Sequence, residues 1–278
     1  KKSGVIGAGQ MASAIIRGLL DKKVVKPESI FIYDPSPVAQ QNMKKLNVNV
    51  VHNEPAIIEQ SDVIFLAVKP NYIPNVLENI YPTLENTAEK KLMVSIAAGI
   101  GMDTYLERLP KNQQQMVRVM PNVNCLTHHA ASCYSVSDSV SEEEERTIRQ
   151  IMGAVGTIDK VPEYMMHAVT GLSGSGPAYV YNFIAALADG GVLAGIPRPL
   201  ALKLAVQTVF GSAHNMIASE EHPSVLKDTV ASPGGTTIHG VHAMHAGGVH
   251  LAMMDAVKAA AERSRELSEP VSKPKSKL

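Results

Sequence analysis

A short glycine-rich segment near the start of the chain has the spacing of a phosphate-binding turn. Gly7-Ala8-Gly9-Gln10-Met11-Ala12 fits the pattern GxGxx(G/A), follows a short apolar run and precedes a helical pattern through Leu20. In such a turn Gly7 permits a tight bend, Gly9 lets a pyrophosphate approach the backbone, and Ala12 lets the helix pack against the strand. The segment therefore predicts a dinucleotide site, with a plain strand-to-helix turn as the alternative.

An acidic residue follows the next apolar run, Ile30 to Tyr33. A carboxylate at this place, here Asp34, commonly holds the ribose hydroxyls of the adenosine. It would repel a 2′-phosphate, which favours NADH or the use of both nicotinamide cofactors. The alternative is that Asp34-Pro35-Ser36 only starts a turn and caps the following helix.

Two later runs end in residues that suit the same crevice. Ala67-Val68-Lys69-Pro70 ends one predicted strand, and Ser95-Ile96-Ala97-Ala98-Gly99 ends the next. The carboxyl ends of parallel strands border the ligand crevice of an open α/β sheet. Pro70 stops its strand, and the small residues of the second segment let a flat nicotinamide approach the backbone.

The second half of the chain has two glycine-rich segments at predicted helix starts, Thr170 to Tyr179 and Ala231 to Thr237. In the second, Gly234-Gly235 leaves consecutive backbone N–H groups free to bind a carboxylate. Thr237 adds a hydroxyl that both donates and accepts. Without further evidence, a segment of either kind is more often a helix-start turn than a binding site.

Three histidines raise the question of a metal. His239, His242 and His245 lie three apart on a predicted helix, which places neighbours on one face. No nearby carboxylate completes an HExxH pattern, so we predict no metal site and assign these histidines to an interface or to capping.

The elements that would hold these residues change character along the chain. Its first part alternates short apolar runs with helical patterns, which predicts a parallel sheet covered on both faces. The runs are Ser3 to Ile6, Ile30 to Tyr33, Val48 to Val51, Val63 to Val68, Leu92 to Ile96, Met116 to Met120, Ala130 to Val136 and Gly156 to Val161. The last two flank an acidic helix that Ser141 and Glu144 open as a capping box, and we expect them to extend the sheet at its edge.

After Val161-Pro162 the sequence predicts helices only. We therefore expect an α/β fold, with a Rossmann dinucleotide-binding domain over residues 1–162, an all-α domain over 163–267 and a disordered tail over 268–278. Ala178 to Ala194 and Leu200 to Ala213 are apolar on all sides, so they must be buried on all sides. A domain of this size cannot cover them, which predicts contact with another subunit.

Composition excludes several classes of function. The 278 residues include 26 basic and 26 acidic side chains, which gives no reason to expect nucleic acid or a membrane surface as a partner. No apolar run approaches the ~18 residues of a membrane span, and the first strand leaves no room for a cleaved leader. The two cysteines, Cys125 and Cys133, form no recognised motif and suit a reducing compartment as small apolar residues. We expect a cytoplasmic protein, with the peroxisome as an alternative because Ser276-Lys277-Leu278 matches an import signal.

Taken together, four segments resemble the pyrroline-5-carboxylate reductase family: Gly7 to Ala12, Ala67 to Pro70, Thr170 to Tyr179 and Leu226 to Ile238. The resemblance runs from Val5 to about Leu267. It implies a Rossmann domain followed by a helical domain that interleaves with a second subunit, a homodimer that often forms a pentamer of dimers, and the cytoplasm or mitochondrion as location. The implied reaction is the reduction of Δ1-pyrroline-5-carboxylate to L-proline by NADPH or NADH.

The resemblance also implies which residues form the site. We place the substrate near Glu163, Glu220, Gly234, Gly235, Thr236 and Thr237. We place the cofactor along Ile6, Gly7, Ala8, Gly9, Gln10, Met11, Asp34, Ser36, Asn53, Ala67, Val68, Lys69, Pro70, Ile96, Ala97 and Ala98. Two positions depart from the family: Tyr33-Asp34 replaces a small polar pair, and Thr229 stands where asparagine is common.

The implied chemistry asks little of acid-base groups. Hydride adds most easily to a protonated C=N bond, so the enzyme mainly orients the nicotinamide against the imine carbon. We assign the hydrogen bond to the imine nitrogen to Thr237, and Glu220 either favours the iminium or is a solvated carboxylate. A β-hydroxyacid dehydrogenase, a non-catalytic dinucleotide sensor and a structural oligomer are the alternatives; the first requires a lysine that Gly171 to Tyr179 lacks.

Overall fold

The computed structural model describes residues 1–268, which form two compact units. Of the described residues, the first unit contains 1–175 and 259–268, and the second contains Gly176–Lys258. The predicted Ser276-Lys277-Leu278 signal lies outside the described residues, as does the predicted tail apart from Ser268, which is the last residue of helix α12.

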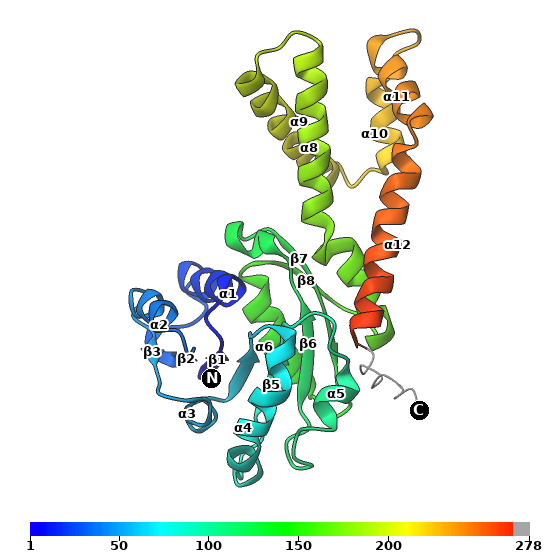
Figure 1. Cartoon of the computed structure of the whole chain (residues 1–278). Helices are drawn as coiled ribbons and strands as arrows, with labels where there is room; N and C mark the ends of the chain where they lie inside the picture. Colours follow the sequence, from blue (N-terminus) through cyan, green and yellow to red (C-terminus); the bar gives the residue numbers. More distant parts are fainter. Residues whose placement is uncertain (269–278) are drawn as a thin grey trace, which may run out of the picture. The chain divides into compact units, whose positions relative to one another are not determined.

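The first unit is built on an eight-stranded sheet with the order β3-β2-β1-β4-β5-β6-β7-β8 (Figure 1). Its strands are β1 (Ser3–Ile6), β2 (Ile30–Tyr33), β3 (Asn49–Val50), β4 (Val63–Leu66), β5 (Leu92–Ser95), β6 (Met116–Met120), β7 (Ala130–Val136) and β8 (Gly156–Lys160). The first six have the strand order of a doubly wound dinucleotide-binding sheet. The prediction that β7 and β8 extend the sheet at its edge is confirmed.

One pair of neighbouring strands departs from the predicted parallel arrangement. β6 and β7 are antiparallel, with Arg118 opposite Ser135. The connection between them contains only the short helix η3 (Val123–Thr127). A parallel return needs a crossover of a dozen or more residues, so this short connection requires the antiparallel pair.

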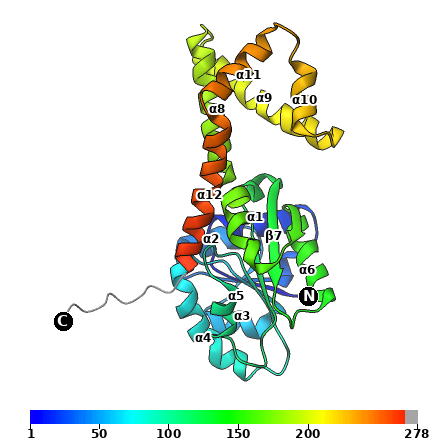
Figure 2. The ribbon, with the colours of Figure 1, turned by 90° about the vertical axis from the view of Figure 1, so that its right-hand side faces the viewer.

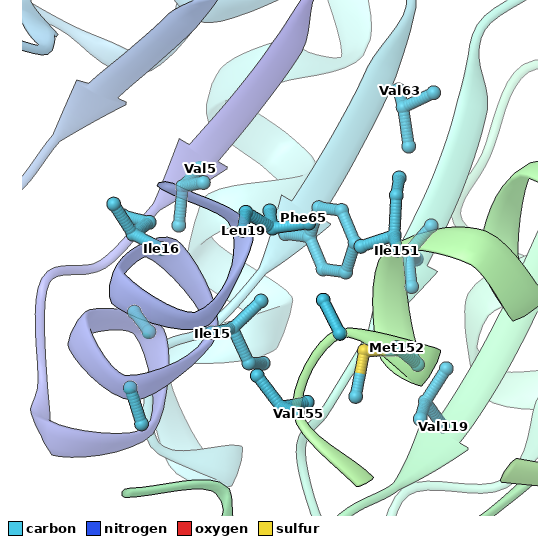
Figure 3. Close-up of a cluster of buried hydrophobic side chains, with 14 of the residues drawn as sticks. Val5, Ile15, Ile16, Leu19, Val63, Phe65, Val119, Ile151, Met152 and Val155 are labelled. Atoms are coloured by element: carbon cyan, nitrogen blue, oxygen red, sulfur yellow. The ribbon is translucent and has the colours of Figure 1, made fainter. Parts of the chain in front are cut away.

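Helices cover both faces of the sheet, as predicted (Figure 2). One core cluster joins the strands to α1 (Gln10–Asp21), α2 (Pro37–Lys44) and α6 (Glu142–Gly153). Figure 3 shows Leu19, Phe65 and Ile151 of this cluster, which come from α1, β4 and α6. The other cluster joins the strands to α3 (Glu54–Gln60), α4 (Ile73–Glu85) and α5 (Met102–Leu106). In β1, β2, β4, β5 and β6, neighbouring residues along the strand enter opposite clusters, which fixes the strand register.

Helix α6 begins with the predicted capping box. The Ser141 hydroxyl accepts the N–H of Glu144, and the Glu144 carboxylate accepts the N–H of Ser141 at 2.7 Å. One turn on, the buried Glu145 accepts hydrogen bonds from Lys160 Nζ at 2.7 Å and from the Tyr134 hydroxyl at 2.9 Å. Burial raises the pKa of Glu145, but the hydrogen bonds from Lys160 and Tyr134 outweigh it, so the net pKa is lowered. This network ties α6 to β7 and β8.

We expect Glu145→Gln to reduce the free energy of unfolding by about 1–2 kcal/mol at pH 7, because the amide replaces two charge-assisted bonds. The folded-state pKa of Glu145 is depressed, so its contribution is present above the unfolded value near ~4.3 and is lost as the pH falls through the folded value. The difference between variant and parent should therefore disappear near ~pH 3. Urea titrations at both pH values measure it, and an equal difference at the two pH values would contradict the assignment.

The segment after β8 remains part of the first unit. It forms η4 (Glu163–Met165), α7 (Met166–Val169) and a π-helical turn, η5 (Thr170–Gly174). Asn122 Nδ2 donates to the Ser173 carbonyl oxygen at 3.0 Å, which ties this turn to the loop after β6. The boundary between compact units therefore falls at Ser175, thirteen residues beyond the predicted domain boundary at 162 (175 − 162).

The second unit is entirely helical, as predicted. It contains α8 (Gly176–Leu193), α9 (Arg198–Ser219), α10 (Pro223–Val230), α11 (Thr236–Ala246) and the first part of α12 (Val249–Ser268). Its buried apolar cluster consists of Ala188, Ala201 and Ala205. Larger apolar side chains on these helices are exposed, among them Leu193 at 90 % and Phe210 at 60 %. Within residues 1–268 no helix is long and apolar enough to cross a bilayer.

Candidate cofactor and substrate sites

The turn after β1 requires glycine at its first position. Gly7 has φ +102°, and a Cβ atom there would lie 2.8 Å from the carbonyl oxygen of Ala67. The N–H of Gly7 donates to the Tyr33 carbonyl oxygen at 2.8 Å, which holds the turn against the end of β2. Gly7 thus lies where the strand order reverses between β1 and β4, the usual ligand crevice of such sheets.

The start of α1 provides a place for an anion. Gly9 is its N-cap and makes no side-chain cap, and a Cβ added at Gly9 would meet nothing within 4 Å. The first N–H groups of a helix have no intrahelical partner, and the helix dipole adds positive potential there. Open space beside these donors fits the pyrophosphate of a dinucleotide. Ala12, which is 1 % exposed, lets the helix approach the sheet.

Asp34 engages the backbone around the turn. Its Oδ2 accepts the N–H of Ala8 at 2.7 Å, and its Oδ1 accepts the N–H of Ser36 at 2.8 Å. Ser36 also caps α2, where its hydroxyl accepts the N–H of Ala39 at 3.4 Å. Asp34 therefore lies at the predicted cofactor crevice, and the Asp34-Pro35-Ser36 segment also forms the predicted turn that caps α2.

A groove of about 550 Å³ follows the carboxyl ends of β1, β2 and β4. This volume lies within the ~300–1,000 Å³ of typical small-molecule sites. It brings together eight of the predicted cofactor residues: Ile6, Gly7, Gly9, Asp34, Ser36, Ala67, Val68 and Lys69. It also contains residues that the sequence analysis did not select: Tyr33, Pro35, Glu54, Tyr72, Asn75, Val76 and Asn79.

The other predicted cofactor residues lie outside the lining of this groove. Gln10 and Met11 line a smaller hollow with Ala14, Val123 and Leu126. The Asn53 side chain caps α3, accepting the N–H of Ala56 at 3.0 Å. The remaining predicted cofactor residues outside the groove are Ala8, Pro70, Ile96, Ala97 and Ala98. The last three directly follow β5.

The segment after β5 is held by a buried hydroxyl pair. Ser95 Oγ accepts the N–H of Ala97 at 3.2 Å and lies 2.5 Å from the Tyr105 hydroxyl of α5. Burial is the main cause that raises the pKa of Tyr105 to about 12, so the hydroxyl stays protonated. Tyr105 therefore supports the backbone that is predicted to face the nicotinamide.

Glu163 is held by donors from three parts of the sheet unit. Its Oε1 accepts the N–H of Met102 at 3.1 Å and forms an ion pair with Arg118 of β6. Its Oε2 accepts a hydrogen bond from the Ser135 hydroxyl of β7. The Arg118 side chain is 6 % exposed and that of Glu163 is 38 % exposed. The carboxylate of Glu163 is thus fixed in place rather than free to rotate.

His167 continues this polar cluster. Its Nδ1 lies 3.0 Å from the hydroxyl of Ser264, which is 5 % exposed and belongs to α12. Burial first, then the charges of Arg118 and Arg265, lower the pKa of His167, although Glu163 opposes them. The imidazole is therefore neutral near pH 7 and joins α7 to the end of α12.

The second unit contains the predicted substrate segment. Gly234 has φ +67°, Gly235 is the N-cap of α11, and Thr236 and Thr237 are the first residues of that helix. A Cβ on Gly235 would lie 2.3 Å from Ser232 Oγ, so a side chain there would displace the Ser232 hydroxyl. Thr237 is half-buried and Thr236 is exposed. The N–H of Gly235 is not free as expected, because it donates to the Ser232 carbonyl oxygen at 3.0 Å. The N–H groups that follow, in the first turn of α11, have no intrahelical partner, an arrangement that binds carboxylates.

The other polar residues of this unit that the sequence analysis named are exposed or bonded only to nearby backbone. Glu220 is the exposed C-cap of α9, with φ 54°. The Thr229 hydroxyl donates to the Leu226 carbonyl oxygen at 2.7 Å, within its own helix. His239 Nδ1 lies 2.9 Å from the Gly235 carbonyl oxygen. Within the described chain, no group of three or more His, Cys, Asp and Glu side chains could hold a metal ion.

The sheet order, the Gly7 turn and the open N-terminus of α1 define a dinucleotide-binding Rossmann fold. Residues 2–99 match a family described as NADP oxidoreductase, coenzyme F420-dependent, and residues 163–267 match pyrroline-5-carboxylate reductase dimerisation.

Full-length relatives agree with these matches. The chain is 44% identical to a pyrroline-5-carboxylate reductase of Arabidopsis thaliana, covering 96% of each chain. It is 43% identical to one of Methanosarcina acetivorans, covering 96% of this chain and 98% of that protein. The solved Plasmodium falciparum pyrroline carboxylate reductase with NADP bound is 33% identical, with TM-score 0.86 over 96% of this chain and 98% of that one. The chain belongs to the pyrroline-5-carboxylate reductase family, so the expected family, fold and enzyme class are confirmed.

Proposed function

We propose that this protein reduces Δ1-pyrroline-5-carboxylate to L-proline with NADPH or NADH, the last step of proline biosynthesis. The observation that carries the proposal is the 44% identity to a named reductase over 96% of the chain. The free helix N-terminus beside Gly9 and the groove at the strand ends supply a site for the dinucleotide. A β-hydroxyacid dehydrogenase is disfavoured, because Gly171 to Tyr179 contains no lysine.

The reaction moves one hydride and one proton. A bound reduced nicotinamide would supply a hydride for the new C–H bond at the imine carbon, and the C=N electron pair would stay on nitrogen. If the imine nitrogen is protonated before the transfer, the product is the secondary amine. If it is not, the nitrogen takes up a proton after the transfer. The protein mainly holds the two reactants in contact and places a hydrogen-bonding group near the nitrogen.

The start of α11 supplies the substrate contacts in this proposal. The first N–H groups of α11, beginning at Thr236, bind the substrate carboxylate, because they lack intrahelical partners and lie at the positive end of the helix dipole. The Thr237 hydroxyl hydrogen-bonds the imine nitrogen. Glu220 favours the cationic form of the imine. Glu163 lies near the substrate, in the orientation that Arg118 gives its carboxylate.

Thr237→Ala should lower kcat about 10–100-fold and leave the affinity for NADH near that of the parent. The hydroxyl acts on the imine, whereas the dinucleotide is held at the start of α1. Thr237→Ser keeps a hydroxyl and should restore most of the activity, and Thr157→Ala, an exposed change on β8, serves as the matched control. Steady-state kinetics at saturating substrate measure the effect. An unchanged kcat for Thr237→Ala would remove the hydroxyl from the reaction.

The proposed activity itself is tested by substrate choice. The protein is mixed with NADH or NADPH and offered either pyrroline-5-carboxylate or a panel of β-keto and 2-keto acids, while absorbance of the reduced nicotinamide is followed. We expect oxidation of the cofactor with the imine and none with the keto acids. Turnover of a keto acid alone would assign the protein to a different class of dehydrogenase.

We further infer a homodimer formed by the residue range 163–267. The match to a dimerisation family supports it, as do the exposed apolar side chains of α8 and α9. A pentamer of such dimers remains a proposal that rests on the family resemblance. Analytical ultracentrifugation separates a dimer from a decamer by mass.

The proposed compartment is the cytoplasm, with the peroxisome and the mitochondrion as alternatives. A fluorescent protein fused ahead of Lys1, which keeps the Ser276-Lys277-Leu278 end free, tests the proposal by imaging. A diffuse signal supports the cytoplasm. A punctate signal that disappears when Ser276-Lys277-Leu278 is deleted would assign the protein to the peroxisome.

A further inference from the structure

Charged side chains are unevenly distributed in the groove at the ends of β1, β2 and β4. Asp34 and Glu54 are acidic, and Lys69 is the one basic side chain among its lining residues in the described chain. In dinucleotide-binding sheets, the end of β2 holds the adenosine ribose, and a basic side chain nearby accommodates a 2′-phosphate. The charge around this end of the groove therefore determines the relative affinity for NADH and NADPH.

Asp34 contributes a fixed negative charge. The N–H groups of Ala8 and Ser36 hold its two oxygens at 2.7 Å and 2.8 Å. These donors are neutral, so they orient the carboxylate without cancelling its charge. A rotation that moved the charge away from the ribose would break both hydrogen bonds.

Glu54 contributes a second negative charge from the neighbouring strand end. It is the first residue of α3, which follows β3, and β3 pairs with β2 through Val50 and Ile32. Glu54 is half-buried, and within residues 1–268 its carboxylate has no hydrogen bond or ion pair. Both charges act on the same groove residue: after burial, the charge of Glu54 and then that of Asp34 raise the pKa of Tyr33, which also lines the groove.

Lys69 is poorly placed to compensate. It follows β4, and β1 lies between β4 and β2 in the sheet. Neighbouring strands are about 4.8 Å apart, so the ends of β4 and β2 are separated by roughly 10 Å. That separation is about one Debye length at ~0.1 M salt, and Lys69 itself is exposed.

We propose that Glu54 is a specificity-determining residue that, with Asp34, disfavours the 2′-phosphate of NADPH and makes NADH the preferred cofactor. The proposal rests on the proposed dinucleotide site and extends it from the end of β2 to the start of α3. A 2′-phosphate carries close to two negative charges at neutral pH, so each carboxylate beside it weakens NADPH binding while leaving NADH binding almost unchanged.

The test measures binding rather than turnover. Calorimetric Kd values for NADH and NADPH are determined for the parent, Glu54→Gln, Glu54→Lys and the control Glu59→Gln, which lies on the exposed side of the same helix. We expect Glu54→Gln to lower the ratio Kd(NADPH)/Kd(NADH) about fivefold and Glu54→Lys about twentyfold, with Glu59→Gln unchanged. Both shifts should shrink when salt rises from ~0.05 M to ~0.5 M.

The ratio of the two Kd values decides the proposal. A change below about twofold in both Glu54 variants, or an equal change in Glu59→Gln, overturns it. If the parent binds neither nucleotide, the dinucleotide site itself is refuted, which separates failure of the proposed function from failure of the specificity assignment. Circular dichroism of each variant verifies that the fold is retained.

Discussion

Arg118→Met should both destabilise the protein and nearly abolish its activity. The substitution leaves Glu163 with hydrogen bonds but no cation, in a place where the Arg118 side chain was 6 % exposed. Removing one partner of such a pair costs about 2–4 kcal/mol of unfolding free energy, somewhat less than for a fully buried pair because Glu163 is partly exposed. The displaced carboxylate should lower kcat/KM roughly 100-fold.

Two comparisons separate these effects. Arg118→Met combined with Glu163→Gln removes the unpaired charge and should recover stability but not activity. Arg146→Met breaks an exposed pair with Glu142 in α6 and should change stability by less than ~0.5 kcal/mol. Urea titrations and steady-state kinetics measure both quantities. If Arg118→Met keeps the stability and activity of the parent, the ion pair neither stabilises the fold nor orients the Glu163 carboxylate for the reaction.

The second large effect is expected on assembly. Phe210→Glu should convert the dimer to monomers at micromolar concentration and remove the activity. The buried cluster of the second unit consists of three alanines, whereas Phe210 of α9 is 60 % exposed within one chain. Burying a phenylalanine contributes about 2 kcal/mol, and a twofold interface repeats the loss, so the dimer Kd should rise roughly 1,000-fold.

Lys203→Glu is the matched control for this prediction, because it changes the charge of an exposed polar position on the same helix. It should leave both the mass and the activity unchanged. Light scattering coupled to size-exclusion chromatography gives the mass. A dimeric, active Phe210→Glu protein would show that the apolar face of α9 around Phe210 is not the subunit contact.

The sequence predicted the features that depend on local pattern. Gly7 could be assigned because only glycine tolerates φ +102° beside the Ala67 carbonyl oxygen. The apolar runs matched the strands, and Ser141 with Glu144 matched the start of α6, because neighbours in the sequence determine these features.

Features that depend on distant residues were missed. The antiparallel β6-β7 pair follows from a short connection rather than from strand composition. Glu163 was selected, but its partners Arg118 and Ser135 were not, because they come from two separate strands. A charged residue inside the apolar run Met116 to Met120 was the available signal. His167 and Ser264 are 97 residues apart, and no local pattern connects them.

Hydride transfer from a labelled cofactor tests the central claim most directly. The protein is incubated with pyrroline-5-carboxylate and NADH that carries deuterium at C4 in the transferable position, and the product is analysed by mass spectrometry and NMR. We predict L-proline that contains one deuterium, located at the former imine carbon, in an amount equal to the NADH oxidised. Oxidation of NADH without labelled proline, or no oxidation with either nicotinamide cofactor, would contradict the proposed function.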